Sequence, residues 1–395
     1  MQFFKKRAPR AIARHGRLNL QSKGSAFGGL LIKGLAAILG ATIALAGISV
    51  YELSNTIKGN ALNIPGAKAI TAADLKGPIN MLLVGSDTRA GQGAGYGNET
   101  SNLADVMILL HISTDRKNAV AVSFPRDLLV PWPACPSTSG GPGYLPQALG
   151  QLNATIANGG PGCTLMTIEQ LTGVTIPYLA MIDFKGVIEM SNAIGGVDVC
   201  VSKAINDPYT QTYLEPGKYT LQGKAALQFL RTRHGVGDGS DLARISNQQV
   251  FLTSLVRKIK SAGVLTNPVE LYALANAAAR NMKLSQSLTD LGTLVSLASA
   301  LKNVSLEKMV FLQVPSHGGL PAPYSGRVEP NYDQANILFQ KLRDDLPVIL
   351  GNANTGAGAV LATPSASPSA TPSPSSSGSL DWATGTNAGQ TTCSN

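Results

Sequence analysis

An uncharged apolar run near the N-terminus constrains the possible folds of this chain more than any other feature. No charged side chain occurs from Gly34 to Tyr51, and residues 27–32 extend the apolar run upstream of the single Lys33. About 20 apolar residues cross a bilayer as a helix, and a lysine near one end can reach the interface with its amine. The sequence therefore predicts one transmembrane helix over residues 27–51.

Basic residues gather on the N-terminal side of this run. The first 33 residues hold eight of the 32 Lys and Arg residues and no acidic residue, which leaves 24 basic against 23 acidic residues elsewhere. Positive charge marks the cytoplasmic end of a membrane helix. Residues 1–26 are therefore predicted to be a cytoplasmic tail at the cell membrane, in a single-pass protein whose folded part is extracytoplasmic. The balanced remainder argues against nucleic acid as a partner.

A cleaved signal peptide is the alternative reading of the N-terminus, since Ala44-Leu-Ala46 offers a small-residue cleavage site. Either reading exports the folded part. Cysteine usage agrees with export, because Cys135 and Cys163 bracket a Pro/Gly-rich stretch that a disulfide could staple. Cys200 is expected to be buried as a small hydrophobe, and Cys393 to lie in a tail.

Segments with strand and helix patterns alternate after the apolar run. Strands are predicted at 79–85, 104–112, 118–124, 178–182, 197–201 and 309–314, and helices at 146–158, 163–171, 183–196, 241–262, 268–282, 288–301 and 332–345. Such alternation predicts a layered domain of the α/β or the α+β class. Of these we expect the α/β class, with α-β-α layers around a central mixed sheet. We place this α/β domain at 79–350, after a stalk at 52–78. Residues 351–395 are rich in Pro, Ser, Thr and Ala, which predicts a disordered tail.

A glycine-bearing loop with arginines on both sides is the strongest candidate for an anion site. The arginines are Arg231, Arg233 and Arg244. Glycine permits close backbone approach, and the planar arginine fork binds phosphate through two hydrogen bonds. Asp241 begins a predicted helix, so Arg244 and Gln248 share one face near its positive end. A solvated loop with surface ion pairs is the alternative, but it explains a single arginine better than the cluster.

Charged residues also stand where predicted strands begin or end. Asp87 follows the first strand and Asp105 opens the second, so their carboxylates could converge on a divalent cation such as Mg²⁺. Capping of a turn and of a strand edge are the alternative roles. Arg126 and Asp127 end the third strand, where sites in α/β sheets usually lie, or else they solvate a sheet edge.

Five ordered motifs resemble the LytR-CpsA-Psr family. They are Asn80-Met-Leu-Leu-Val-Gly-Ser-Asp-Thr-Arg89, Asp105 opening a strand, Ser123-Phe-Pro-Arg-Asp127, Asp183-Phe-Lys-Gly186 with Gly195-Gly-Val-Asp198, and Arg231-Thr-Arg-His234 through Gln249. The resemblance covers about residues 79–262. It implies a membrane-anchored extracytoplasmic phosphotransferase that moves a glycopolymer from a polyprenyl-pyrophosphate carrier to peptidoglycan.

The resemblance also implies roles for individual positions. Asp87 and Asp105 would hold Mg²⁺, and Asp105 or Asp241 could act as base for the acceptor hydroxyl. The implied pyrophosphate-binding residues are Arg89, Arg126, Arg231, Arg233, Arg244 and Gln248. Those implied in catalysis are Arg126, Arg231, Arg233, Arg244 and Asp241.

The chain departs from the family pattern at three positions. Leu103 and Asn247 stand where arginine is frequent, and Gln151 stands where a lysine precedes an Asn-Ala pair. The site is therefore expected to carry less positive charge than in many relatives. Two alternative functions stay open: hydrolysis of polyprenyl pyrophosphate with water as the acceptor, and a non-catalytic lipid-phosphate-binding regulator of the envelope.

Overall fold

The computed structural model describes residues 23–62, 64, 76–87, 103–137, 141–261, 267–351, 354–362 and 378–395, with the backbone alone for 23–30. The chain divides into two compact units, residues 1–52 and 53–395. The predicted cytoplasmic tail at 1–26 lies almost wholly outside the described residues.

Helix α1 (Lys23–Gly59) contains the predicted membrane span. Its segment Leu31–Gly59 is long and apolar enough to cross a bilayer, and the most apolar window in it is not buried by other parts of the protein. The helix continues through residues 52–59, where we predicted a stalk. The prediction fails there because Leu53 and Ile57 are buried in the apolar core of the second unit, which stabilises the last turns of the helix.

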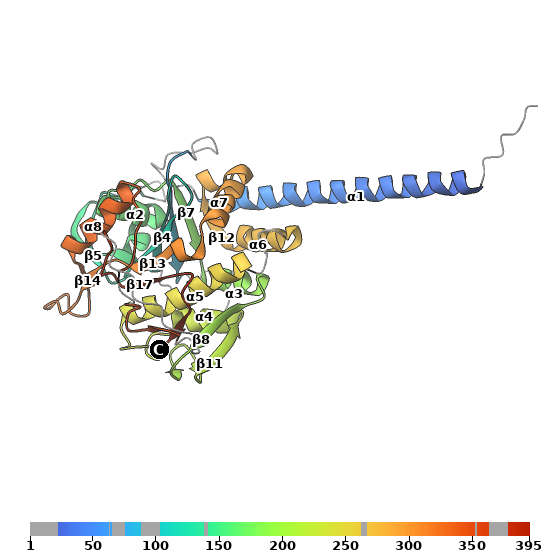
Figure 1. The fold of residues 1–395 in the computed structure, drawn as a ribbon. Coiled ribbons are helices and arrows are strands. Elements are labelled where there is room, and N and C mark those ends of the chain that lie inside the picture. Colours follow the sequence, from blue (N-terminus) through green and yellow to red (C-terminus); the bar gives the residue numbers. More distant parts are fainter. Residues whose placement is uncertain are drawn as a thin grey trace, which may run out of the picture. The chain divides into compact units, whose positions relative to one another are not determined.

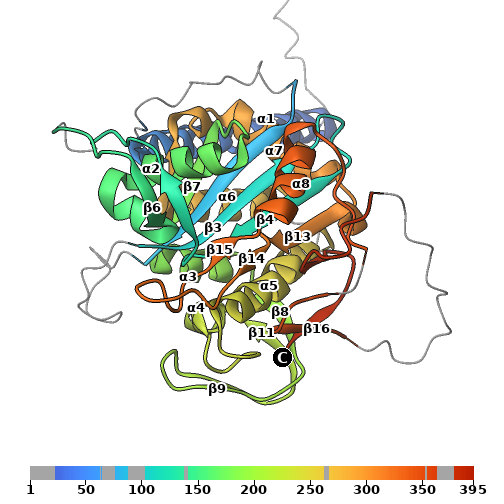
Figure 2. The same ribbon diagram turned by 90° about the vertical axis from the view of Figure 1, so that its left-hand side faces the viewer.

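A mixed sheet of eight strands forms the centre of the second unit (Figures 1 and 2). Its order is β1 (Ala61–Leu62), β12 (Met282–Ser285), β7 (Tyr178–Ile182), β2 (Ile79–Ser86), β3 (Ala104–Ile112), β4 (Ala119–Phe124), β13 (Met309–Gln313) and β17 (Gly385–Asn387). β3 is antiparallel to β2 and β4, while β2 is parallel to β7. The predicted mixed sheet is therefore confirmed.

Helices cover both faces of this sheet. α2 (Thr155–Thr172) and α8 (Tyr332–Arg343) contribute to the apolar cluster on one face. α6 (Pro268–Asn281) and α7 (Leu291–Asn303) contribute to the cluster on the other. Every residue of β4 is buried, as expected for a strand covered on both sides. The predicted α-β-α layering is confirmed.

A second, four-stranded sheet has the order β11 (Gly217–Leu221), β8 (Val197–Val201), β18 (Thr392–Ser394) and β16 (Ala359–Leu361). Its apolar side packs on α4 (Lys224–Arg231) and α5 (Asp241–Ser261). The helix α3 (Phe184–Ala193) precedes β8, and the Asp183 side chain caps it by accepting a hydrogen bond from the Gly186 amide. The described residues also form three two-stranded sheets: β5 (Leu129–Trp132) with β6 (Gln147–Gln151), β9 (Ile205–Asp207) with β10 (Thr212–Leu214), and β14 (Ser316–His317) with β15 (Glu329–Pro330).

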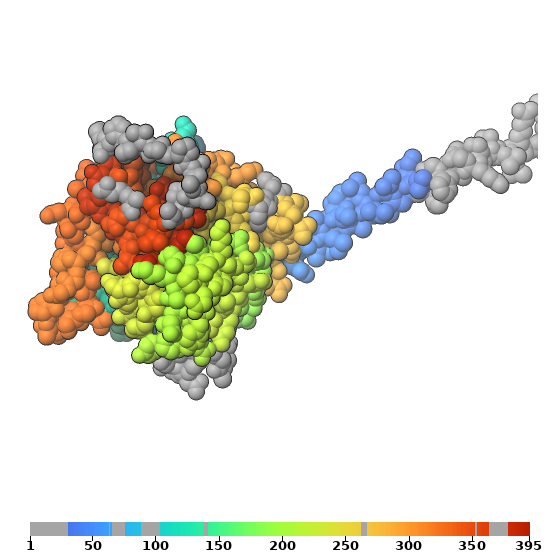
Figure 3. All heavy atoms as spheres, turned by 60° about the horizontal axis from the view of Figure 1, so that its bottom comes forward, coloured from blue at the N-terminus to red at the C-terminus, as the bar shows by residue number. Residues whose placement is uncertain are grey.

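The C-terminal residues form part of both larger sheets. β17 pairs with β13, and β18 lies between β8 and β16. Cys393 forms a disulfide with Cys200. Figure 3 shows these red residues packed against the green and yellow segments around α4 and α5. The prediction of a disordered tail is therefore wrong for residues 354–362 and 378–395, because backbone pairing and a disulfide order them. The prediction that Cys200 is simply a buried small side chain is also wrong, because it is disulfide-bonded to Cys393. Residues 363–377 lie outside the described residues.

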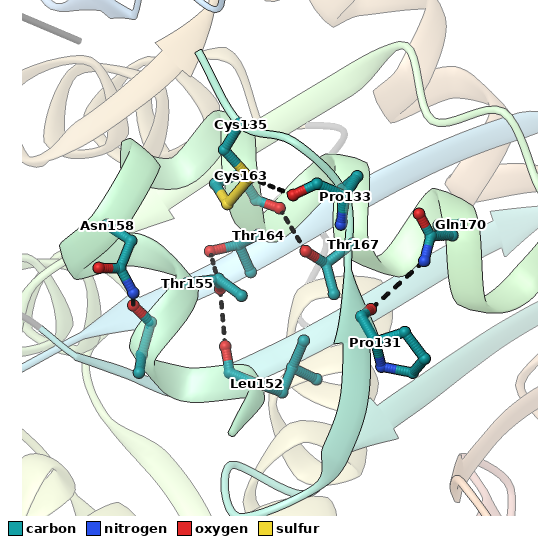
Figure 4. The surroundings of a disulfide bond; sticks show 11 residues. Pro131, Pro133, Cys135, Leu152, Thr155, Asn158, Cys163, Thr164, Thr167 and Gln170 are labelled. Atoms are coloured by element: carbon teal, nitrogen blue, oxygen red, sulfur yellow. Dashed lines mark hydrogen bonds between the residues drawn. A yellow bond between two sulfur atoms is a disulfide. The ribbon is translucent and has the colours of Figure 1, made fainter. Parts of the chain in front are cut away.

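The predicted disulfide between Cys135 and Cys163 is confirmed. Figure 4 shows it beside α2, where the hydroxyl groups of Thr155 and Thr164 are 2.8 Å apart. The helix predicted over 146–158 is wrong over its first part, where β6 pairs with β5. Gly150 lies against the ring of Trp132 so closely that a Cβ there would meet it, so packing against this ring overrides the local helical pattern.

Candidate active site

The ends of three neighbouring strands bring the predicted charged residues to one edge of the central sheet. Ser86 at the end of β2 pairs with Ala104 at the start of β3. Because β4 is antiparallel to β3, it also ends at this edge, two residues before Arg126. The N-terminal turn of α5 reaches the same place, since Arg244 donates from Nη2 to the Asp105 carbonyl at 3.1 Å.

Four charged side chains form an alternating network at this edge. Arg126 Nη1 donates to Asp105 Oδ1 at 2.8 Å, and Arg126 Nε lies 3.4 Å from Asp241 Oδ1. Arg244 Nη2 lies 2.7 Å from the same Asp241 oxygen. Residues from β3, the end of β4 and the start of α5 thus meet, as the resemblance implied. We call Asp105, Arg126, Asp241 and Arg244 the edge network.

Arg244 is buried and the other three residues of the edge network are partly buried, yet several of their polar atoms lack a hydrogen bond. Both carboxylate oxygens of Asp241 and the Nε atoms of Arg126 and Arg244 are buried without an aligned hydrogen-bond partner. The short distances between opposite charges still make these contacts attractive, because Coulomb attraction does not require alignment. Burial lowers the pKa of Arg126, but the carboxylates of Asp105, Asp241 and Asp127 outweigh it, so the pKa of Arg126 is raised overall.

The arginine loop is positioned differently. Arg231 ends α4, and its guanidinium carbon lies 4.4 Å from the centre of the Phe184 ring, a cation–π contact. Arg233 Nε donates to the Gly239 carbonyl at 2.8 Å. Backbone and aromatic groups therefore hold these two arginines.

Asp207 holds the arginine loop through hydrogen bonds, and the sequence patterns did not identify it. One of its carboxylate oxygens accepts from Thr232 Oγ1 at 2.8 Å, Arg233 N at 2.9 Å and His234 N at 3.1 Å. Burial raises the pKa of Asp207, but the hydrogen bonds it accepts outweigh burial and lower that pKa overall. The local signal was the Asp-Pro pair at 207–208, since Asp207 also accepts from Tyr209 N in an Asx turn.

Gln248 lies one turn after Arg244 on α5 and is buried. Its Nε2 donates to the Leu230 carbonyl at 3.0 Å, immediately before Arg231. The neighbouring Asn247 donates to the Phe229 carbonyl and accepts from Ser394 Oγ. In this structure the two amides tie α5 to the end of α4. The predicted contact of Gln248 with pyrophosphate stays a prediction.

Asp87 is buried at the end of β2. Its Oδ1 accepts from Leu103 N at 2.7 Å, and its own amide donates to the Leu103 carbonyl at 3.1 Å. Leu103, one of the departures from the family pattern, thus ties Asp87 to the strand that carries Asp105. Arg89 lies outside the described residues, so its predicted role stays untested.

Two carboxylates at one sheet edge fit Mg²⁺ by donor chemistry, because this ion takes oxygen ligands and keeps several waters or phosphate oxygens. Across the described parts of the chain, no group of three or more His, Cys, Asp or Glu side chains is arranged to hold a metal. Asp87 and Asp105 would therefore hold the ion only together with water or substrate oxygens.

A further cluster adjoins the edge network around Asp127, which the sequence placed only at a strand end. Asp127 Oδ1 accepts from Gln151 Nε2 at 2.5 Å and from Arg327 Nη1 at 2.8 Å. Its Oδ2 lies 3.6 Å from Arg126 Nε. No local pattern indicates Arg327, because it comes from the turn before β15, 200 residues after Asp127.

Comparison with known proteins shows the family of this chain. Residues 47–342 match the LytR_cpsA_psr family, and the chain belongs to that family. It is 29% identical over 296 residues to the cell wall biosynthesis protein LcpA of Corynebacterium glutamicum, covering 68% of this chain and 56% of the relative. It is 28% identical over 235 residues to the polyisoprenyl-teichoic acid–peptidoglycan teichoic acid transferase TagT of Bacillus subtilis, covering 58% and 66%.

The fold is also that of solved structures. The crystal structure of TagV from B. subtilis superposes with a TM-score of 0.54 at 21% identity, covering 69% of this chain and 98% of the other. The chain spans less than two thirds of the length of the two relatives compared by sequence.

Proposed function

We propose that this protein is a membrane-anchored transferase that moves a glycopolymer from a polyprenyl-pyrophosphate carrier to peptidoglycan outside the cell. One observation carries the proposal: Arg126 and Arg244 meet Asp105 and Asp241 at one sheet edge, in a member of a family that includes named teichoic acid transferases. Apolar helix α1 would be the anchor, with the basic N-terminus in the cytoplasm.

The arginines would bind the pyrophosphate of the donor. Its phosphate oxygens would compete with Asp241 for the two guanidiniums, whose Nε atoms are buried without an aligned acceptor. Each charged hydrogen bond gained contributes about 1.5–3 kcal/mol. Arg231 and Arg233, held by aromatic and backbone groups, would complete the anion site together with Arg89.

The reaction exchanges one phosphorus–oxygen bond for another. The oxygen of an acceptor sugar hydroxyl attacks the phosphorus that carries the glycopolymer, and the bond from that phosphorus to the bridging oxygen breaks. The lipid monophosphate leaves, and the hydroxyl proton passes to a carboxylate. Asp241 is the better candidate for this base, because neither of its oxygens has an aligned donor, whereas Asp105 accepts a hydrogen bond from Arg126.

Mg²⁺ is the proposed cofactor, and Asp87 and Asp105 would hold it. When bound, the ion would neutralise charge that develops on the phosphate oxygens. Asp105 would then exchange its contact with Arg126 for the ion, which would leave that guanidinium for the substrate.

The lipid part of the donor needs apolar surface near the arginines. Apolar side chains of β2 and β3 that face α5, α6 and α7 stay partly exposed, among them Met81, Leu83 and Val106. Leu252 and Val256 of α5 are also only partly buried against the same cluster. These residues offer the carrier lipid a place beside the edge network.

The test is a transfer assay with the full-length protein in detergent, a polyprenyl-pyrophosphate-linked glycopolymer, peptidoglycan and Mg²⁺. Wild type should transfer the polymer, and Arg233→Ala combined with Arg244→Ala should abolish transfer. Transfer that the double variant leaves unchanged contradicts the proposal. Release of free glycopolymer phosphate without acceptor would identify a hydrolase instead, and lipid binding without any product would identify a regulator.

A further inference from the structure

Arg327 is fixed beside the edge network by backbone pairing. Val328 N donates to the Asp127 carbonyl at 3.2 Å, and Leu129 N donates to the Val328 carbonyl at 2.9 Å. These bonds hold the turn before β15 against the chain that leaves β4. The position of Arg327 therefore follows from the fold rather than from one side-chain contact.

The carboxylate of Asp127 joins Arg327 to Arg126. Arg327 Nη1 lies 2.8 Å from Asp127 Oδ1, while Arg126 Nε lies 3.6 Å from Oδ2 of the same group. The Arg327 side chain is 41% exposed, compared with 7% for Arg244. Because a guanidinium has five N–H donors, the hydrogen bond of the half-exposed Arg327 to Asp127 leaves donors available beside the partly buried Arg126.

Gln151 approaches the same carboxylate oxygen. Its Nε2 lies 2.5 Å from Asp127 Oδ1, so the glutamine amide and the Arg327 guanidinium are neighbours around one atom. Gln151 carries no charge, at a position where the family resemblance implies a lysine. An isolated exposed ion pair contributes little to stability, but Arg327 shares with Arg126 of the edge network a carboxylate that is only 13% exposed.

We infer that Arg327 supplies the positive charge missing at Gln151 and binds the pyrophosphate of the lipid-linked donor. This inference rests on the proposed function for the identity of the donor. Arg327 would act as a substrate-binding residue that adds uniform binding, so its loss should raise KM with little change in kcat.

The experiment compares four full-length variants with wild type: Arg327→Ala, Arg327→Lys, Arg327→Ala combined with Gln151→Lys, and Arg280→Ala as a control. Arg280 is an exposed arginine of α6 that contacts Asn276, outside the site. Binding of inorganic pyrophosphate with Mg²⁺ is measured by calorimetry, KM and kcat by polymer transfer, and Tm by thermal unfolding.

Arg327→Ala should raise the Kd for pyrophosphate and the KM for the donor roughly 10- to 100-fold, as expected for one charged hydrogen bond. Arg327→Lys should recover part of the loss, and Gln151→Lys should restore binding in the Arg327→Ala background. The control should match wild type. If Arg327→Ala lowers Tm without changing Kd, the ion pair is purely structural and the inference is overturned. If Gln151→Lys does not restore binding, the claim that Arg327 replaces a positive charge at position 151 is overturned.

The outcomes separate this inference from the proposed function. Transfer by wild type that Arg327→Ala does not impair overturns the inference alone. Pyrophosphate binding that depends on Arg327, without any transfer, overturns the proposed function and keeps Arg327 as an anion contact. A wild type that neither binds pyrophosphate nor transfers polymer overturns both.

Discussion

The edge network and the arginine loop hold their arginines by opposite means. Arg126 and Arg244 are positioned by the carboxylates of Asp105 and Asp241. Arg231 and Arg233 are positioned by an aromatic ring and a backbone carbonyl, in a loop anchored by Asp207. In the edge network, an arginine could exchange a carboxylate for a bound anion, because both partners are negatively charged. In the arginine loop, these contacts of Arg231 and Arg233 are made to uncharged groups.

The largest effect should follow from removing charge at the edge. Arg126→Ala with Arg244→Ala removes two charged contacts, which at about 1.5–3 kcal/mol each predicts a loss of roughly 100- to 10,000-fold in kcat/KM. The measurement is polymer transfer under single-turnover conditions. A matched pair, Lys203→Ala with Lys218→Ala, removes two exposed cations of the smaller sheet region and should leave the rate unchanged. A loss of less than tenfold in the arginine variant would mean that the edge network does not bind the transferred group.

The stability of the arginine loop should depend instead on the C-terminal strand that it bonds to, which a disulfide holds in place. Cys393→Ser removes a disulfide that closes a chain segment of 193 residues, and loss of a native disulfide typically costs 2–5 kcal/mol of unfolding free energy. Cys135→Ser, whose disulfide spans 28 residues, should cost less in the chain-entropy account. Denaturant unfolding measures both losses. Equal losses of unfolding free energy, or a greater loss from Cys135→Ser, would contradict this account of the disulfide between Cys200 and Cys393.

Asp207 should give a smaller, pH-dependent effect. Its pKa is lowered in the folded protein, so the stability it contributes is present above the pKa of the unfolded chain and is lost as pH falls through the folded value. Asp207→Asn keeps an acceptor oxygen but loses the charge, and should cost about 1–3 kcal/mol at neutral pH and less in acid. Unfolding free energies of wild type and variant, measured across the acid range, should converge as pH falls. Parallel curves would show that the charge contributes nothing.

Sequence patterns predicted the central sheet and the charged residues at its strand ends, because alternation and strand limits are local properties of the chain. They could not predict how those residues pair, since Arg244 meets Asp105 across 139 residues. Arg327 was missed for the same reason, whereas Asp207 was missed although the Asp-Pro pair at 207–208 marks a turn there. Low hydrophobicity also misled the reading of residues 378–395, where pairing with β8 and β13 supplies the order.

Two of the departures from the family pattern, Asn247 and Gln151, have different surroundings in the structure. Asn247 is fully buried between the Phe229 carbonyl and Ser394 Oγ, so an arginine there would need the C-terminal strand to move. Gln151 instead stands next to a cation from another part of the chain. Asn247 is thus part of the packing between α4, α5 and β18, whereas Gln151 lies beside the charged group of Arg327.

The place of β18 sets the order in which the domain can mature. This strand lies inside the smaller sheet, yet it is synthesised long after β8, its parallel neighbour. In an exported chain, the sheet beside Gly237, whose amide bonds to the Asn395 carbonyl, stays incomplete until residues 392–394 have crossed the membrane. The loop around Gly237 would therefore reach its final hydrogen bonding only once residues 392–395 are in place and the disulfide between Cys200 and Cys393 has formed.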